Sequence, residues 1–250
     1  MSLFVDMHVH LDHCYFEEDL DMVISDARKN GIKIINNCGI NPEKNRKTLE
    51  LAEKYDIVKA SLGIYPTDSL KLTEEEFDSE LDFIKENKKK IIAIGEVGLD
   101  YLKKEEIVRQ KNNFLKIIEL AEKIKKPLIV HSRKAEEDAV YALESSKLKK
   151  IVMHCFCGNK NLVKKGYGNG WFFTIPTNVV RSFQFQDLIK TVDLSHLFCE
   201  TDSPYLSPFK DKRNEPSFVI ESYKKIAEIK SMDINEVANN IYMNYQNLFG

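Results

Sequence analysis

Short apolar runs rich in β-branched residues recur along the chain, and each is followed by a longer stretch with helical periodicity. The short runs predict eight strands: Leu3–Asp6, Ile32–Asn36, Val58–Leu62, Ile91–Gly95, Leu128–His131, Ile151–His154, Trp171–Thr174 and Leu197–Glu200. The longer stretches predict nine helices: Phe16–Lys29, Glu43–Lys54, Glu74–Glu86, Val108–Ile124, Ala135–Ser145, Asn161–Tyr167, Phe183–Thr191, Phe218–Lys230 and Ile234–Phe249.

Eight strands that alternate with helices over 250 residues are the pattern of a (β/α)8 barrel. A doubly wound open sheet uses the same alternation, usually with fewer strands, and is the structural alternative. No low-complexity linker, internal repeat or shift in composition marks a domain boundary. The sequence therefore predicts an α/β fold, a TIM barrel, in a single domain that covers residues 1–250.

The composition narrows the class of protein without changing this picture. A content of 43% hydrophobic and 30% charged residues excludes disordered, collagen-like and disulfide-scaffold proteins. The 37 Lys and Arg nearly balance the 39 Asp and Glu, so any nucleic-acid substrate has to be bound by local groups. The five cysteines are odd in number, and no apolar run reaches the roughly 18 residues of a membrane span. We expect a soluble, cytoplasmic protein with reduced thiols, no membrane association and no obligate protein partner.

Histidines and carboxylates cluster at the C-terminal ends of the predicted strands. His8 and His10 are two residues apart, so their side chains point to the same side of the first strand. Four further residues end or follow a later strand: Glu96, His131, His154 and Asp202. In a parallel barrel these strand ends form the face on which barrel enzymes carry their active sites.

The donor set indicates a metal centre. Taken singly, each residue is more often a hydrogen-bonded loop residue or a helix N-cap. Six such groups beside apolar strands are costly to bury unless they are paired, and a divalent cation supplies that pairing. Four His, one Glu and one Asp are too many ligands for one tetrahedral zinc ion. They fit two divalent cations (Mg²⁺, Mn²⁺, Zn²⁺ or Fe²⁺) that share a carboxylate, for which Glu96 is the best candidate.

Two arginines are candidates for binding substrate. Arg133 lies two residues beyond His131, and its guanidinium could bind a phosphate; a structural salt bridge explains it equally well. Arg213 occupies a polar stretch after the last strand, where it could bind phosphate or be neutralised by Glu215 to brace the loop.

The remaining polar residues near the predicted site have simpler interpretations. Cys155 and Cys157 flank His154, but no second Cys pair accompanies them, which favours packing or loop roles over a thiolate zinc site. Asp6 shares strand parity with the two histidines and could orient them. His13 falls in a loop, and His196 precedes its strand at the opposite end. No histidine is then left to act as a base, so Asp202 is the predicted general base.

Six segments in order resemble the motif set of the TatD family of metal-dependent deoxyribonucleases: VDMHVHLD (5–12), GEVGLDY (95–101), IVHSR (129–133), MHCF (153–156), ETDSP (200–204) and KRNEP (212–216). The resemblance extends to NYQNLFG (244–250) and so covers essentially the whole chain. It implies a (β/α)8-barrel hydrolase with two divalent cations that acts on DNA phosphodiesters, usually as an exonuclease. By residue, His8, His10 and Asp202 match the ligands of one metal, His131 and His154 those of the other, and Glu96 the bridging carboxylate.

The chain departs from this family pattern after the third strand. The family often has Gly-x-His-Pro-His there, whereas this chain reads Gly63-Ile64-Tyr65-Pro66-Thr67. Both family histidines are absent, so we expect different substrate contacts at this loop. A second departure replaces a Ser or Thr of the family by Cys157, which places a thiol near the site.

Three functions compete. The leading prediction is a two-metal phosphoesterase, a TatD-like deoxyribonuclease with Asp202 and Glu96 in catalysis. The alternative is an amidohydrolase-type barrel that cleaves C–N or ester bonds, since His-x-His on the first strand also fits that group. Such enzymes often use a carboxylated lysine as bridge, so Glu96 favours phosphoester chemistry. A non-catalytic nucleic-acid-binding protein with a vestigial site is the third possibility, and the presence of all six candidate ligands argues against it.

Overall fold

The computed structural model describes residues 3–102, 104 and 106–250, and these residues form eight strands. The strands belong to one parallel sheet in chain order: β1 (Phe4–Val9), β2 (Ile32–Cys38), β3 (Val58–Leu62), β4 (Ile91–Asp100), β5 (Leu128–Arg133), β6 (Ile151–Met153), β7 (Phe172–Pro176) and β8 (Leu197–Glu200). The first and last strands are neighbours, because Val9 bridges Ser203 in parallel just beyond β8. This order and closure are those of a (β/α)8 barrel and exclude the doubly wound open sheet.

Helices lie between the strands and after the last one: α1 (Leu20–Lys29), α2 (Pro42–Lys54), α3 (Pro66–Ser69), α4 (Glu74–Glu86), α5 (Ile107–Ile124), α6 (Glu136–Glu144), α7 (Lys160–Gly168), α8 (Phe183–Thr191), α9 (Ile220–Lys230) and α10 (Ile234–Phe249). Four 3₁₀ turns accompany them among the described residues: η1 (Cys14–Phe16), η2 (Thr177–Val180), η3 (Leu194–His196) and η4 (Pro216–Val219). Local hydrogen bonds explain where several of these helices begin. Thr73, for example, accepts from the backbone of Glu76 while the Glu76 side chain bonds the Thr73 N–H, a capping box that begins α4.

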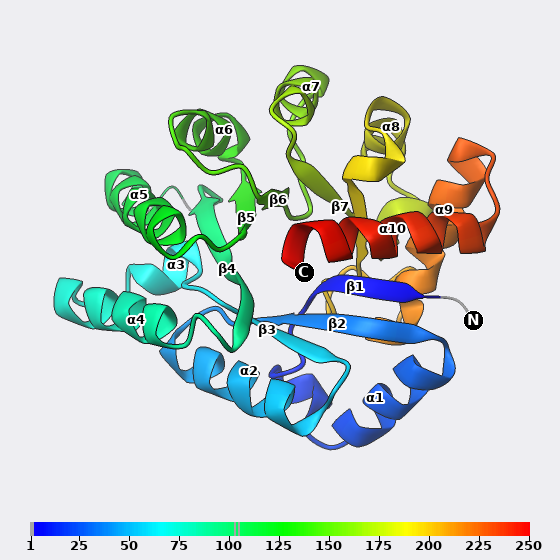
Figure 1. The fold of residues 1–250 in the computed structure, drawn as a ribbon, viewed down its shortest axis with the longest axis horizontal. Helices are drawn as coiled ribbons and strands as arrows, with labels where there is room; N and C mark the ends of the chain where they lie inside the picture. Colours follow the sequence, from blue (N-terminus) through cyan, green and yellow to red (C-terminus); the bar gives the residue numbers. More distant parts are fainter. Residues whose placement is uncertain (1–2, 103, 105) are drawn as a thin grey trace. The chain divides into compact units, whose positions relative to one another are not determined.

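The described residues divide into two compact units. The first contains residues up to 37, 51–59 and 173–250. In it β1 pairs with β2 and β7 with β8, and α10 lies alongside β1 (Figure 1). The hydroxyl of the buried Tyr223 accepts from the Val5 N–H at 2.9 Å and donates to the Val5 carbonyl at 3.0 Å, which fixes α9 against β1.

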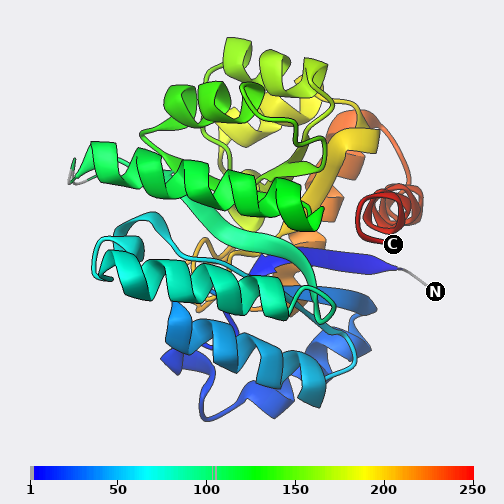
Figure 2. The same cartoon turned by 60° about the vertical axis from the view of Figure 1, so that its left-hand side comes forward.

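The second unit contains residues 38–50 and 60–172. In it β4 pairs with β3 and β5, and β5 pairs with β6. The helices α4 and α5 lie side by side (Figure 2), and α5 packs against β4. The core of this unit is apolar, with Phe77, Phe114 and Ile129 almost fully buried. Burial of such side chains supplies the main driving force for folding.

The predicted elements are present, but several of their bounds differ. The strand predicted at Leu3–Asp6 is Phe4–Val9, and the strand predicted at Ile91–Gly95 continues to Asp100. His8 and Glu96 are therefore strand residues rather than residues that follow a strand. The predicted helix Phe16–Lys29 begins only at Leu20, after the turn η1.

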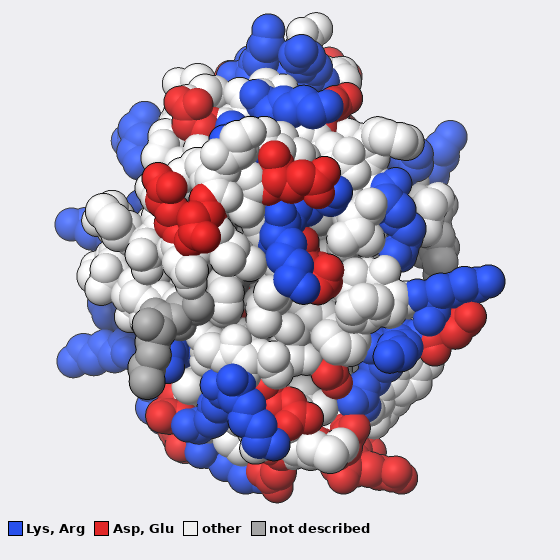
Figure 3. All heavy atoms as spheres, turned by 90° about the vertical axis from the view of Figure 1, so that its right-hand side faces the viewer, with Lys and Arg blue, Asp and Glu red and all other residues white. Residues whose placement is uncertain are grey.

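The surface and the helices agree with the composition. On the face drawn in Figure 3, basic and acidic side chains are interspersed, in keeping with a formal net charge of −2. No helix in the described part of the chain is long and apolar enough to cross a membrane.

Candidate active site

The first unit brings three of the predicted ligands together. His8 is the fifth residue of β1, His10 follows the strand directly, and Asp202 lies two residues after β8. The Nε2 atoms of His8 and His10 are 3.3 Å apart, and Asp202 Oδ1 lies 3.5 Å from the His10 nitrogen and 3.9 Å from the His8 nitrogen. Both imidazoles are buried.

Backbone hydrogen bonds hold Asp202 in this place. Its N–H donates to the His8 carbonyl at 2.9 Å, and the His10 N–H donates to the Ser203 carbonyl at 2.9 Å. Asp202 has a left-handed backbone with φ of 55°, a conformation that Asp tolerates better than most residues. The chain after β8 is thereby turned so that the carboxylate reaches the two histidines of β1.

Asp6, a buried residue of β1, hydrogen-bonds to the backbone on both sides of this cluster. Its buried carboxylate accepts from the Thr201 N–H at 2.8 Å, from the Thr201 hydroxyl at 2.6 Å and from the His8 N–H at 3.4 Å. Burial raises the pKa of Asp6 well above its ordinary value, although the bonds from Thr201 oppose this. The sequence suggested that Asp6 orients the two histidines. In the structure its bonds go to the His8 N–H of β1 and to Thr201, the residue after β8, so it positions the backbone there.

The donor spacing in this cluster fits a divalent cation. Two ligand atoms at about 2.0–2.1 Å from a tetrahedral ion lie about 3.3 Å from each other. The nitrogen and oxygen atoms of His8, His10 and Asp202 are separated by 3.3–3.9 Å. Two imidazole nitrogens that face each other at this distance, with a carboxylate beside them, are the donors that Zn²⁺ and related ions prefer.

The second unit brings together the other three predicted ligands. Glu96 comes from β4, His131 from β5, and His154 follows β6. Glu96 Oε1 lies 2.8 Å from His131 Nδ1 and 3.7 Å from His154 Nε2. One donor atom from each residue lies within 4.8 Å of the others, so this cluster also fits a metal ion.

Two glycines allow these backbones to approach closely. Gly98 has φ of 139°, and a Cβ atom there would lie 2.0 Å from the His131 carbonyl oxygen. A Cβ atom on Gly63 would lie 2.4 Å from the Glu96 carbonyl oxygen. The glycines of the Gly95–Tyr101 segment and of the loop after β3 are thus required for the local packing of this cluster.

A hydrogen-bond network surrounds the other side of His131. Its Nε2 lies 3.1 Å from the Tyr65 hydroxyl and 3.6 Å from Asp100 Oδ2. Tyr65 donates to Asp100 Oδ2 at 2.6 Å, and Arg133 donates to the same oxygen from Nε at 3.0 Å and from a terminal nitrogen at 2.5 Å. These contacts fix the ring of His131 and direct Nδ1 toward Glu96.

The electrostatics of this network favour positive charge at His131. Burial alone would lower the pKa of His131, but hydrogen bonds to Asp100 and Glu96 outweigh it and raise the pKa above its ordinary value. Burial would likewise raise the pKa of Asp100, yet hydrogen bonds from His131, Arg133 and Tyr65 hold it far below the usual range. Burial, the charge of Glu96 and the bond to Asp100 raise the pKa of Tyr65, so its hydroxyl stays a donor.

Sequence reasoning did not single out Asp100, and it noted Tyr65 only as a departure from the family pattern. Asp100 carried a signal, because it follows Glu96 and Gly98 at steps of two and so shares their side of β4. Tyr65 stands where the resembled family has a histidine, and its hydroxyl occupies the polar position beside His131.

The two predicted substrate-binding arginines have different surroundings. The Arg133 side chain is 51% exposed while it bonds Asp100. Arg213 instead bonds both oxygens of Asp19, at 3.0 and 2.7 Å, donates to the Tyr15 carbonyl and lies 4.5 Å above the Phe16 ring. Arg213 thus braces the loop before α1, and a phosphate contact by it stays a prediction.

The cysteines and the other histidines fall where the sequence placed them. Cys157 is exposed, and Cys155 is partly buried in a left-handed conformation after β6. His13 caps η1, where its Nδ1 accepts from the Tyr15 N–H. His196 ends η3, directly before β8.

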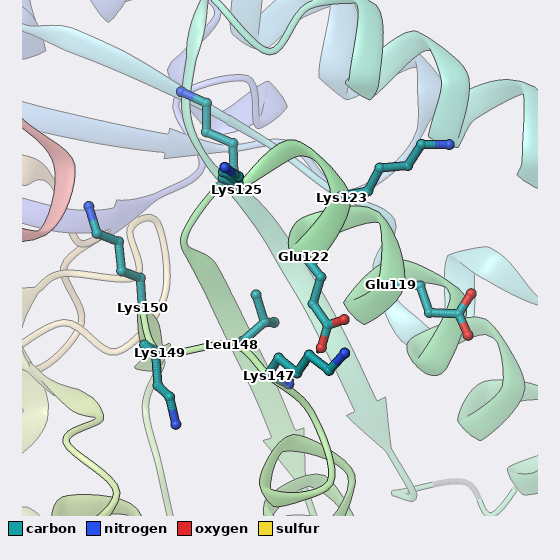
Figure 4. A pocket seen from close by; sticks show the side chains of 9 residues that line it. Glu119, Glu122, Lys123, Lys125, Lys147, Leu148, Lys149 and Lys150 are labelled. Carbon is teal, nitrogen blue, oxygen red and sulfur yellow. Dashed lines mark hydrogen bonds between the residues drawn. The ribbon is translucent and has the colours of Figure 1, made fainter.

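Two cavities of the second unit lie outside the ligand cluster. One of about 570 Å³ is lined by lysines that precede β5 and β6, among them Lys125, Lys126, Lys149 and Lys150 (Figure 4). It therefore lies at the strand ends opposite those that carry His131 and His154. A second, of about 390 Å³, lies beyond the C-terminal ends of these strands and is lined by Tyr101, Lys134 and the start of α6.

A (β/α)8 barrel with histidines and carboxylates at the C-terminal ends of its strands defines a barrel hydrolase that depends on metal ions. The family model of TatD-related DNases matches residues 5–250. Human deoxyribonuclease TATDN3 is 33% identical over 257 residues, which cover 98% of this chain and 94% of that protein. The chain therefore belongs to the TatD family of metal-dependent hydrolases.

Two further relatives agree with this assignment. An uncharacterized metal-dependent hydrolase of Methanocaldococcus jannaschii is 36% identical over 241 residues, 96% of this chain and 94% of that protein. The crystal structure of YJJV, a TatD homologue of Escherichia coli K12, matches with a TM-score of 0.92 at 25% identity over 98% of this chain and 97% of that one. The family and the barrel fold predicted from the sequence are both confirmed.

Proposed function

We propose that this protein is a deoxyribonuclease that hydrolyses phosphodiester bonds with two divalent cations and removes nucleotides from a DNA end. The observation that carries the proposal is the pair of three-donor clusters, each built from histidines and a carboxylate with donor atoms a few ångströms apart. The name of human deoxyribonuclease TATDN3, a relative at 33% identity, supports DNA as substrate.

The six ligands divide between the two ions in this proposal. His8, His10 and Asp202 hold one cation, and Glu96, His131 and His154 hold the other. We further propose that Glu96 is shared by both ions, as the sequence predicts. Mg²⁺, Mn²⁺ and Zn²⁺ all suit such a mixed set of nitrogen and oxygen donors. When bound, the cations lower the pKa of a water molecule and stabilise charge that develops on the phosphate.

The protein's own groups then hold the substrate and move the proton. Asp202 places one carboxylate oxygen beside the His10 nitrogen at 3.5 Å, and in our proposal its second oxygen accepts the proton of the attacking water. The water oxygen bonds to phosphorus as the ester P–O bond breaks, and the leaving oxygen takes a proton from solvent. Arg133, which is half-exposed next to His131, is the proposed phosphate contact, with Arg213 as a second candidate.

A substrate panel tests the proposal. The purified protein is assayed with Mg²⁺, Mn²⁺ or Zn²⁺ on single-stranded and duplex DNA, RNA, simple phosphodiesters, carboxylic esters and amides, with and without chelator. We expect metal-dependent release of mononucleotides from DNA. Hydrolysis of amides or carboxylic esters without hydrolysis of DNA would instead support the amidohydrolase alternative. Binding of DNA without turnover of any substrate would support the non-catalytic alternative.

A further inference from the structure

A row of aromatic rings, two of them exposed tyrosines, leads away from the histidine cluster of the first unit. The ring centroids are 6.5 Å apart for His10 and Tyr205, 5.7 Å for Tyr205 and His13, and 4.5 Å for His13 and Tyr15. We name these four residues the aromatic row. Its two tyrosines are open to solvent: Tyr15 is 63% exposed and Tyr205 is 50% exposed.

The two tyrosine rings of the aromatic row are partly open to solvent. All three contacts are edge-to-face, with interplanar angles of 67°, 82° and 63°. Neighbouring rings therefore do not stack on each other. An aromatic ring that is held by its edge and open on a face can accept another planar ring by stacking.

The two loops that carry the row are fixed by hydrogen bonds. The Tyr205 N–H donates to the Asp202 carbonyl at 2.9 Å, and Asn214 Nδ2 donates to the Tyr205 carbonyl at 2.7 Å. On the other loop, the Tyr15 N–H donates to His13 Nδ1 at 3.2 Å, and Arg213 donates to the Tyr15 carbonyl. Because the backbone at both tyrosines is anchored, a ligand that stacks on them loses little free energy to ordering of the loops.

The position of the row selects the ligand. Tyr205 lies three residues after Asp202, and its ring contacts that of His10, so the row begins at two proposed metal ligands and leads away from them. In a nucleotide one sugar joins the phosphate to its base. A strand whose phosphate lies at the histidine cluster therefore brings its base within reach of the neighbouring rings. Proteins that bind single-stranded nucleic acid stack bases on aromatic side chains in this way, without requiring a particular base sequence.

We propose that the aromatic row is a nucleobase-stacking site for a single DNA strand. This inference rests on the proposed function, because it takes a phosphodiester of DNA to be the group held at the metal centre. The rings of Tyr205 and Tyr15 supply the stacking surface, and Arg213 positions the loop of Tyr15. The site favours a strand with bases over a bare sugar-phosphate backbone and does not discriminate strongly among the four bases.

Binding of a hydrolysis-resistant phosphorothioate oligonucleotide tests the site without any need for turnover. Fluorescence anisotropy of a short strand, labelled at the end far from the enzyme, gives Kd for the metal-loaded wild type and for the variants Tyr205→Ala, Tyr15→Ala and Tyr205→Phe. An abasic strand of equal length is measured in parallel. The control variant is Tyr141→Ala, because Tyr141 is 52% exposed but lies on α6 of the second unit.

We expect each of Tyr205→Ala and Tyr15→Ala to raise Kd for the base-containing strand about tenfold, which equals about 1.4 kcal/mol. Kd for the abasic strand stays unchanged in these variants, and Tyr205→Phe and Tyr141→Ala bind like wild type. Equal wild-type affinity for both strands, or equal weakening of both by Tyr205→Ala, would overturn the stacking site. Tyrosine-dependent preference for bases in a protein that fails to hydrolyse DNA would retain the site and refute only the proposed reaction.

Discussion

At the scale of the single residue, Asp202 combines three properties that a general base needs. Its carboxylate lies 3.5 Å from His10, its backbone is anchored to His8, and its side chain is largely but not fully buried. A carboxylate held in this way can keep one oxygen at a cation and offer the other to water.

Asp202→Asn should therefore separate metal binding from catalysis. We expect the variant to retain the fold and most of its metal, because the amide oxygen can still act as a ligand, while kcat falls by roughly 10²–10⁴. Single-turnover rates and metal stoichiometry check this. Glu96→Gln is the comparison variant, and it should lose metal, since a neutral amide is a poor bridge between two cations. A wild-type rate in Asp202→Asn would remove this residue from catalysis.

Arg133 is the second residue with a separable role. Arg133→Ala should lower kcat/KM on DNA and leave metal content intact. The fall should correspond to a loss of about 1.5–3 kcal/mol of transition-state stabilisation, the usual contribution of a charge-assisted hydrogen bond. Steady-state kinetics and metal analysis check this. Arg28→Ala, which removes an exposed ion pair with Asp56, serves as control. Kinetics like those of wild type in Arg133→Ala would leave Arg133 only its structural bonds to Asp100.

At the scale of secondary-structure elements, the close pairing of β4 and β5 brings Glu96 and His131 together. The two strands stay in register from Val97 and Val130 out to Asp100 and Arg133. This pairing passes Gly98, whose backbone conformation and proximity to the His131 carbonyl exclude a side chain.

Gly98→Ala should destabilise the protein by about 3 kcal/mol or more, because it combines a disfavoured backbone conformation with a clash against backbone. Urea unfolding monitored by circular dichroism gives the free energy of unfolding. The matched control is Gly168→Ala in α7, where a Cβ atom meets nothing within 4 Å, and we expect that change to stabilise by about 0.5–1 kcal/mol. Equal stability of both variants would contradict the packing described for β4 and β5.

The loop before α1 offers a pH-dependent test. The hydrogen bond from Arg213 holds the pKa of Asp19 below its ordinary value. A carboxylate whose pKa is depressed in the folded state stabilises the fold above its unfolded pKa and loses that contribution as pH falls through the folded pKa. Arg213→Ala should thus cost about 1 kcal/mol near neutral pH, a modest value because both side chains are partly exposed.

The difference in unfolding free energy between wild type and Arg213→Ala should shrink as the pH is lowered from about 6 to about 3. The part of the difference that persists at low pH comes from the hydrogen bond to the Tyr15 carbonyl and from packing on Phe16, because neither partner changes its charge in this range. Urea unfolding at several pH values measures the difference. A difference that stays constant or grows on acidification would show that the Asp19 pair does not stabilise the loop.

At the scale of the whole molecule, the apolar core and the polar clusters are made of different side chains. The eight strands bury residues such as Val5, Ile94, Val130 and Phe198, none of which is a proposed ligand. The fold therefore has its own source of stability. The single domain, the cytoplasmic location and the absence of an obligate partner stay predictions of the sequence.

Removal of metal should consequently abolish activity without unfolding the protein. With chelator present we expect no hydrolysis of DNA, a far-ultraviolet circular dichroism spectrum like that of the untreated protein, and recovery of activity when metal is restored. Loss of helical signal on chelation would make the ions structural and contradict this separation of core and site.

The sequence by itself determined which elements exist and which residues are candidates for the metal centre. Apolar periodicities of about two and 3.6 residues are local properties, so they predicted all eight strands and most helices. The alternation also predicted parallel strands, because parallel strands require crossovers, but it left their order open between a barrel and a doubly wound sheet. Polar residues at the ends of apolar strands can be recognised from the sequence alone. This pattern identified the six candidate ligands, His8, His10, Glu96, His131, His154 and Asp202.

Tertiary structure decided what depends on partners distant in the chain. β4 continues to Asp100 because β5 pairs with it out to Arg133. Tyr65 meets Asp100 across 35 positions, and Arg213 meets Asp19 across 194. These hydrogen bonds join residues that come together only when the whole fold has formed. Residue type alone left each of them open to several roles.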